Sequence, residues 1–80
     1  MFDYEKLTKR IKEIFKCDVN FAIKMGFSER TLSVKLNNKV DFKQTEIVKA
    51  CELLDIPFSE IDSYFFNLKV QRIEQKKKYE

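Results

Sequence analysis

The chain has 80 residues, enough for one domain, and its hydrophobic and charged contents of 44% and 36% suit a globular protein with a solvated surface. A single glycine and a single proline argue against a β-sandwich or barrel, which needs many turns, so we expect an all-α fold. The net charge of +3 arises in residues 69–80, where five Lys/Arg accompany two Asp/Glu. The rest of the chain is neutral, so a basic binding surface would depend on side-chain placement.

The residue types also exclude several kinds of site. The chain has no histidine, and Cys17 and Cys51 alone make a poor zinc site, so we expect two reduced cysteines. Without histidine, a glycine-rich phosphate loop or paired carboxylates, we expect no enzyme activity, no cofactor and no small-molecule ligand. No signal peptide or long apolar run is present, so we expect a cytoplasmic protein that does not enter a membrane.

The first part of the chain predicts two helices. Apolar residues recur at helical spacing from Asp3 to Lys16, which indicates a first amphipathic helix. A second, short helix is expected from Asn20 to Met25, with its apolar side facing the core. Either Asp18 or Asn20 can cap the start of this second helix.

A tight turn is predicted where the second helix ends. Gly26 is the only glycine, and glycine adopts the left-handed conformation that helix ends commonly need. Two residues later, Ser28 can cap a third helix by accepting a hydrogen bond from the N–H of Thr31. Ala22, four residues before Gly26, is small enough to let the two helices approach closely. These features predict a helix-turn-helix unit, whose second helix can enter a DNA major groove.

The third helix is expected from Glu29 to about Asn37, with Leu32 and Leu36 anchoring one side. Val34 falls on the opposite side, which should be exposed to solvent. Two interpretations stay open for Val34: an incidental exposed valine, or an apolar contact to a thymine methyl group. A polar loop follows at residues 37–41, in which an asparagine can be left-handed.

A fourth helix is expected from about Lys43 to Leu54, ending before Pro57 because the residue before proline is disfavoured in the α region. Its inward residues are expected to be Ile47, Val48, Cys51 and Leu54. Residues 59–62 provide a cap and a first turn for a last short helix, with Phe58 and Ile61 sealing the core.

We divide the chain into a domain at residues 1–66 and a tail at residues 67–80. Apolar and polar residues alternate near the start of the tail, which favours a strand. Because a single strand needs a partner, one hypothesis is a symmetric ribbon between two subunits, with Phe66, Leu68 and Val70 as dimerisation residues. The alternative is a tail that folds over its own domain. Beyond Gln75 we expect a disordered basic end.

A family resemblance rests on NFAIKMGFSERTLSVKLNNKV followed by FKQTEIVKACELLDIPFSEIDSYFF. The spacing of Ala22, Gly26, Ser28, Leu32 and Leu36 resembles the λ-repressor-like helix-turn-helix domains, specifically the small phage regulators of the Cro repressor type. The resemblance covers about residues 2–73. It implies a five-helix λ-repressor-like domain that needs no catalytic chemistry.

The resemblance also implies which residues would contact double-stranded operator DNA. The third helix would present its base-reading residues to the major groove: Glu29, Arg30, Ser33 and Val34. The residues nearer the phosphate strands would be Asn20, Ser28, Lys35, Asn38 and Lys39. One departure is Asp18, which stands where many family members have a phosphate-binding glutamine. Its carboxylate would repel phosphate.

Two functional hypotheses follow. The first is a sequence-specific transcriptional regulator of the phage Cro type, located at the nucleoid in the cytoplasm of a bacterial host. It would bind its operator as a homodimer, with half-sites about 34 Å apart. The alternative is a protein-interaction module of the same fold, such as an anti-repressor or antitoxin partner, without sequence-specific DNA binding. The neutral domain and Asp18 favour this alternative slightly.

Overall fold

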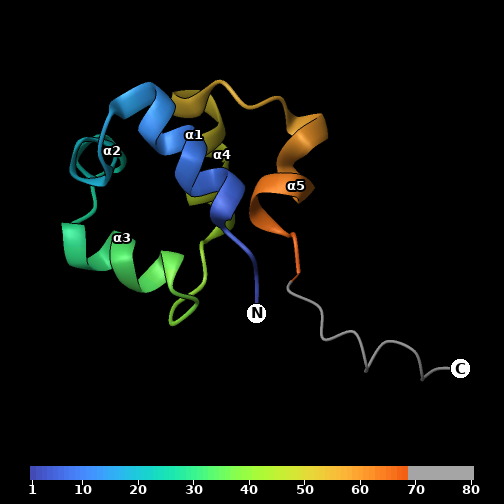
Figure 1. Cartoon of the computed structure of the whole chain (residues 1–80), viewed down its shortest axis with the longest axis horizontal. Helices are drawn as coiled ribbons and strands as arrows, with labels where there is room; N and C mark the ends of the chain where they lie inside the picture. The colour runs from blue at the N-terminus through green and yellow to red at the C-terminus, as the bar shows by residue number, and fades with distance from the viewer. Residues whose placement is uncertain (69–80) are drawn as a thin grey trace, which may run out of the picture.

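The computed structural model describes residues 1–68. Within this range the chain forms five α-helices and one short 3-10 helix (Figure 1). The elements in chain order are α1 (Glu5–Phe15), α2 (Asp18–Met25), α3 (Glu29–Leu36), α4 (Gln44–Leu54), η1 (Phe58–Glu60) and α5 (Ile61–Phe65). The predicted all-α, five-helix fold is thereby confirmed. None of the helices in the described range is long and apolar enough to cross a membrane.

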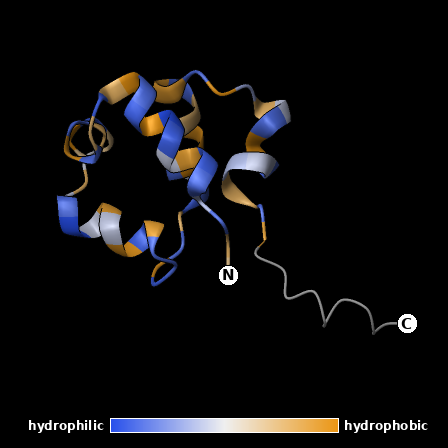
Figure 2. Ribbon diagram, in the orientation of Figure 1, coloured by the Kyte–Doolittle hydropathy of each residue, from blue (hydrophilic) through white to orange (hydrophobic). Residues whose placement is uncertain are grey.

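Helix α1 lies at the centre of the packing. It packs against α2, α4 and α5, and α2 in turn packs against α3 and α4. Figure 1 shows α2 and α3 at one end of the domain and α5 at the other, with α1 crossing α4 between them. Figure 2 shows that the helices turn apolar residues toward this centre and polar residues outward. The buried hydrophobic core consists of Tyr4, Leu7, Ile11, Phe21, Ala22, Met25, Leu32, Ile47, Ala50, Cys51, Leu54, Ile56 and Phe65.

Two residues expected in the core lie outside it. Val48 is 41% exposed and Phe58 is 63% exposed. On α4 the buried stripe is completed by Ala50, and Val48 follows Ile47 by one residue, which turns it about 100° away from the core. Phe58 stands at the start of the 3-10 helix, where nearby Ile56 and Phe65 are buried in its place. The prediction was therefore wrong at both positions.

The turn between α2 and α3 follows the sequence prediction. Gly26 has a φ of 82°, and its N–H donates to the carbonyl of Ile23 at 3.1 Å. The N–H of Phe27 donates to the carbonyl of Ala22 at 2.8 Å, which completes a Schellman motif. Ser28 then accepts from the N–H of Thr31 at 3.0 Å and so caps α3.

A buried ion pair joins α3 to the loop and helix that follow it. Lys35 is 4% exposed, and its Nζ lies 3.0 Å from Glu46 Oε1 on α4. The same ammonium donates to the backbone carbonyl of Asp41 at 3.0 Å. It also lies over the rings of Phe27 and Phe42, at 5.4 and 5.8 Å from their centroids. These contacts fix the position of α3 relative to α4.

The N-terminal segment is held by two distant parts of the chain. Asn38 is left-handed, with a φ of 64°, and its side chain accepts from the N–H of Phe2 at 2.8 Å and donates to the carbonyl of Phe2 at 2.9 Å. On the other side, Asp3 N–H donates to the carbonyl of Asn67 at 2.6 Å, and Phe2 forms an antiparallel bridge with Leu68. At Leu68, therefore, the pairing partner belongs to the same chain. Val70 and the basic end lie outside the described residues.

We expect Gly26→Ala to destabilise the fold by about 1–2 kcal/mol, because a Cβ is unfavourable in the left-handed conformation. Apart from Gly26 and its two neighbours in the chain, no described residue has an atom within 4 Å of the Cβ position, so backbone conformation should set the loss. Gly26→Asn is the matched control and should lose less, since asparagine tolerates this conformation. Urea unfolding followed by circular dichroism measures both. Equal stability of Gly26→Ala and the unaltered protein would contradict the argument.

The pH dependence of stability should depend on Glu46. Burial raises the pKa of this carboxyl. Hydrogen bonds from the Lys43 N–H and the Lys35 ammonium lower it, as do the positive charges of both lysine side chains. The lowering effects outweigh burial, so the pKa lies below its usual 4.5. The stabilisation of the fold by ionised Glu46 is therefore complete above about pH 4.5, and it is lost as the pH falls through the lowered pKa of the folded state.

We expect Glu46→Gln to remove part of this acid sensitivity. It should also lower the free energy of unfolding by about 3 kcal/mol at pH 7, because it leaves the Lys35 ammonium buried without a counter-charge. Lys35→Met should cost less, since it removes the more deeply buried of the two charges and leaves Glu46 hydrogen-bonded to the Lys43 N–H. Denaturant unfolding from pH 3 to pH 7 measures both effects. A Glu46→Gln variant with the stability profile of the unaltered protein would show that the pair is not structural.

Candidate functional site

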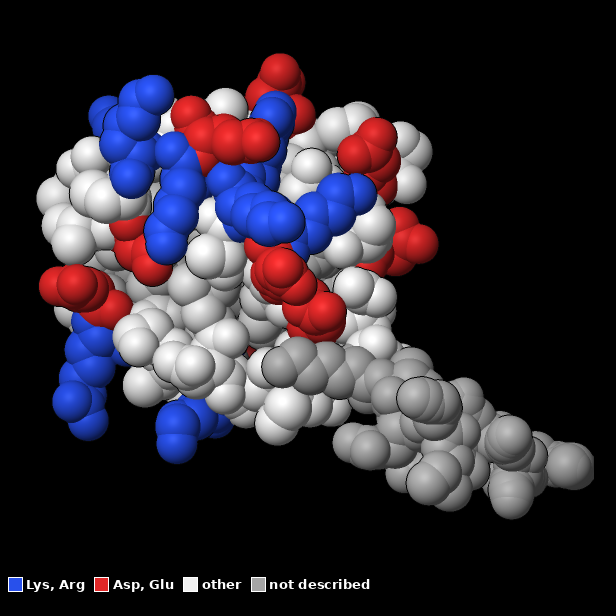
Figure 3. Space-filling model, in the orientation of Figure 1, with Lys and Arg blue, Asp and Glu red and all other residues white. Residues whose placement is uncertain are grey.

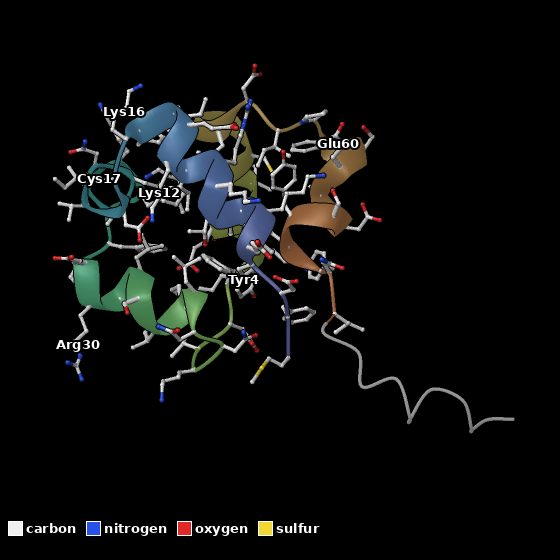
Figure 4. All side chains as sticks on the ribbon, in the orientation of Figure 1. Tyr4, Lys12, Lys16, Cys17, Arg30 and Glu60 are labelled. Atoms are coloured by element: carbon white, nitrogen blue, oxygen red, sulfur yellow. The ribbon has the colours of Figure 1, made fainter. Side chains whose placement is uncertain are left out.

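The face of α3 that was predicted to read bases is accessible. Glu29, Arg30 and Ser33 are exposed, and Arg30 extends away from the body of the domain (Figure 4). Val34 is only half-buried, and its carbonyl accepts from the N–H of Lys39 at 2.9 Å, so its backbone helps to fix the following loop. Figure 3 shows acidic as well as basic side chains over this part of the molecule. The surface therefore has mixed charge.

Of the predicted phosphate contacts, Lys35 is not available. Its side chain is buried in the ion pair with Glu46, and binding a phosphate would require that pair to break. The assignment of Lys35 to the DNA backbone is therefore wrong as a surface contact. The family resemblance placed Lys35 near the phosphate strands, whereas its ammonium donates to the carbonyl of Asp41 in the loop after α3.

The other residues predicted to contact phosphate differ in whether their side chains already form hydrogen bonds within the fold. Asn20 is not a helix cap, because α2 begins at Asp18, and its amide instead donates to the carbonyl of Phe15 at 2.9 Å. Ser28 caps α3, and Asn38 holds the N-terminal segment. Lys39 is exposed. The structure thus leaves Lys39 as the accessible cation among the five residues assigned to the phosphate strands.

A groove beside α3 is acidic. It is lined by residues of α1, α2 and α3 and has a volume of about 330 Å³. Asp18 and Glu29, the first residues of α2 and α3, both contribute to its wall. Negative side chains at helix starts are favoured by the helix dipoles, which accounts for their stability there. They would nevertheless repel a phosphate that approached the same helix ends.

A second hollow is apolar and was not predicted. This aromatic crevice has a volume of about 210 Å³ and is lined by Phe2, Tyr4, Asp41, Phe42, Ile47, Phe65 and Phe66. Its rings pack edge to face: Phe42 lies 5.5 Å from Tyr4 and 5.4 Å from Phe65, and Phe66 lies 5.9 Å from Phe2, as centroid distances.

The rim of the aromatic crevice is exposed. Phe66 is 49% exposed and Leu68, which pairs with Phe2, is 58% exposed. Phe66 and Leu68 are also two of the predicted dimerisation residues. Burial, and secondly the Asp41 carboxylate, raise the pKa of the Tyr4 hydroxyl above its ordinary 10.0, so the crevice wall stays uncharged at Tyr4. An exposed apolar hollow of this kind is typical of a protein-binding surface.

Sequence reasoning missed the crevice because three separate segments build it. They are the N-terminal residues, the loop before α4, and α5 with the residues after it. Helical periodicity describes one element at a time and does not show which loops meet. A usable signal was the phenylalanine content, eight residues in 80, with Phe2 and Phe42 outside the predicted apolar helix stripes.

Comparison with solved structures finds a similar phage protein. The solution structure of the modulator of repression (MOR) of the temperate bacteriophage TP901-1 from Lactococcus lactis matches with a TM-score of 0.75 and 48% identity, over 88% of this chain and 95% of that chain. Among curated proteins, no sequence match was found. Residues 1–68 match the family described as "Protein of unknown function (DUF739)". The chain therefore belongs to the DUF739 family.

Proposed function

We propose that this protein is a phage regulator that modulates transcriptional repression by binding a repressor protein. The relationship to the TP901-1 modulator of repression supports the regulatory role, because 48% identity extends over nearly the whole described chain. This is the protein-interaction hypothesis reached from the sequence, with a repressor as the partner. The observation that carries it is the exposed aromatic crevice.

The aromatic crevice has the properties of an interaction hot spot. Aromatic side chains dominate the energetics of protein interfaces, because they bury a large area with few rotatable bonds. Phe66 and Leu68 at the rim are exposed in the free protein and would lose this solvent contact in a complex. The Lys35 contacts hold the loop that carries Asp41 and Phe42, and the Asn38 hydrogen bonds hold Phe2, so these parts of the wall are formed in the free protein.

The charges around α3 are a weaker match to DNA. DNA-binding proteins gain most of their affinity from cations placed against phosphates. Here Lys35 is already paired, and Asp18 and Glu29 stand at the helix starts that could otherwise bind phosphate. Residues 1–68 carry equal numbers of acidic and basic side chains. These features support a protein partner over an operator.

A Cro-type DNA-binding homodimer is the second candidate. Two observations support this candidate: α2 and α3 pack against each other around the Gly26 turn, as expected of a helix-turn-helix unit, and Arg30 is exposed on α3. An exposed arginine near the start of such a helix can bind guanine bidentately. Dimerisation through Phe66 and Leu68 would use the same crevice rim.

The partner hypothesis is tested with the full chain and a purified phage repressor protein. We expect Phe66→Ser to weaken the complex at least about tenfold in calorimetric titration, because it removes an aromatic side chain from the rim. Phe58→Ser is the matched control: Phe58 is also an exposed phenylalanine, but it lies outside the crevice lining, and its loss should leave affinity unchanged.

If Phe66→Ser and Phe58→Ser bound the repressor equally well, the crevice would not be the interface. If the unaltered protein bound no repressor, the proposed function itself would fail. Sedimentation of the same variants without repressor tests whether the crevice instead serves self-association. Conversion of a dimer to a monomer by Phe66→Ser alone would assign the crevice to self-association.

The DNA hypothesis is tested by selecting binding sites from a random pool of duplexes. We expect no palindromic consensus to be enriched. If one were enriched, Arg30→Ala should lower the binding free energy for that site by about 1–3 kcal/mol and relax the sequence preference at one base pair. Lys39→Ala should instead reduce the slope of log K against log salt concentration by about 1. That combination of results would replace the partner hypothesis with the Cro-type function.

A further inference from the structure

The acidic groove beside α3 contains an unsatisfied carboxylate. Asp18 Oδ1 is buried from solvent, and it has no hydrogen-bond partner within residues 1–68. Buried polar atoms in proteins are nearly always bonded, so this oxygen is an acceptor that the described residues leave unused. The Asp18 residue as a whole is only partly buried and lines the groove, about 330 Å³ in volume, so its carboxylate faces this space.

A second carboxylate, Glu29, lines the same groove. Neither Glu29 nor Asp18 forms an ion pair in the described part of the chain, and no lysine or arginine there lines the groove. Asn37 donates its amide to the carbonyl of Ser33 at 2.8 Å, which leaves the amide oxygen of Asn37 as a further acceptor. The groove therefore offers several acceptors and no cation.

The remaining wall suits an aliphatic chain. Leu36 is partly exposed in the wall of the groove, whereas Leu32 behind it belongs to the buried core. Lysine and arginine side chains combine an apolar stem with a charged head, and they commonly lay the stem along apolar surface. A guanidinium also presents several N–H donors in one plane, which suits a site with more than one acceptor.

We infer that this acidic groove receives a basic side chain, arginine or lysine, from the protein partner. The stem lies against Leu36, and the charged head pairs with Asp18 and Glu29. This inference rests on the proposed function for the source of the side chain, but the groove is separate from the aromatic crevice and shares no lining residue with it. The partner would thus be recognised at two places, one apolar and one charged.

The test uses the full chain labelled with ¹⁵N and N-acetyl-arginine amide as the probe. N-acetyl-citrulline amide is the matched control, because it has nearly the same shape without the charge. We expect saturable amide shift changes at Asp18, Glu29, Ser33 and Asn37 with the arginine probe only. Asp18→Asn should weaken this binding about threefold, as for a partly exposed ion pair. Asp62 is an exposed acid on α5 outside the groove, so Asp62→Asn should leave the binding unchanged.

Glu29→Gln provides a second variant if Asp18→Asn perturbs the spectrum of the folded chain. Equal shift changes with the arginine and citrulline probes, or no effect of either groove variant, would overturn the inference. Because the probe needs no repressor, the result is independent of the proposed function. Arginine binding together with failure to bind a repressor would retain the groove and reject the partner.

Discussion

The arrangement of the domain depends on one buried ammonium group. Lys35 points from α3 under the loop that follows it, where Glu46, the Asp41 carbonyl and two phenylalanine rings surround it. Its charge is satisfied only when α3, the loop and α4 are all in their native positions. Since an unpaired buried charge is strongly unfavourable, this one group disfavours any other placement of α3.

The same interaction connects the two surfaces that carry our proposals. On one side, α3 contributes Glu29 and Ser33 to the acidic groove. On the other, the loop held by Lys35 contributes Asp41 and Phe42 to the aromatic crevice. A residue that the family resemblance assigns to phosphate binding has instead become part of the scaffold. The Lys35 ammonium is therefore engaged inside the fold and is not exposed at the surface.

The helices could be predicted from the sequence because their signals are local. Apolar spacing, Gly26 and Ser28 each act within a few residues of the chain, and the helices and the turn lie where these signals indicate. The environment of Lys35 could not be predicted in this way, since it depends on which segment covers a helix face. The crevice was missed for the same reason: its walls lie far apart in the sequence and meet only in the folded chain.

The attachment of the N-terminal segment links the two ends of the described chain. Residues 2 and 3 are held there by side-chain bonds from Asn38 and by main-chain pairing with residues 67 and 68, outside any helix. Such contacts open at lower free energy than core helices, so their amide hydrogens should exchange with solvent before those of α1. Because Phe2 and Phe66 belong to the crevice, opening of this closure would also open the crevice wall. A ligand in the crevice would therefore slow hydrogen exchange at residues 2–3 and 67–68 together. Occupancy of this surface is in this way coupled to the order of the segments that build it.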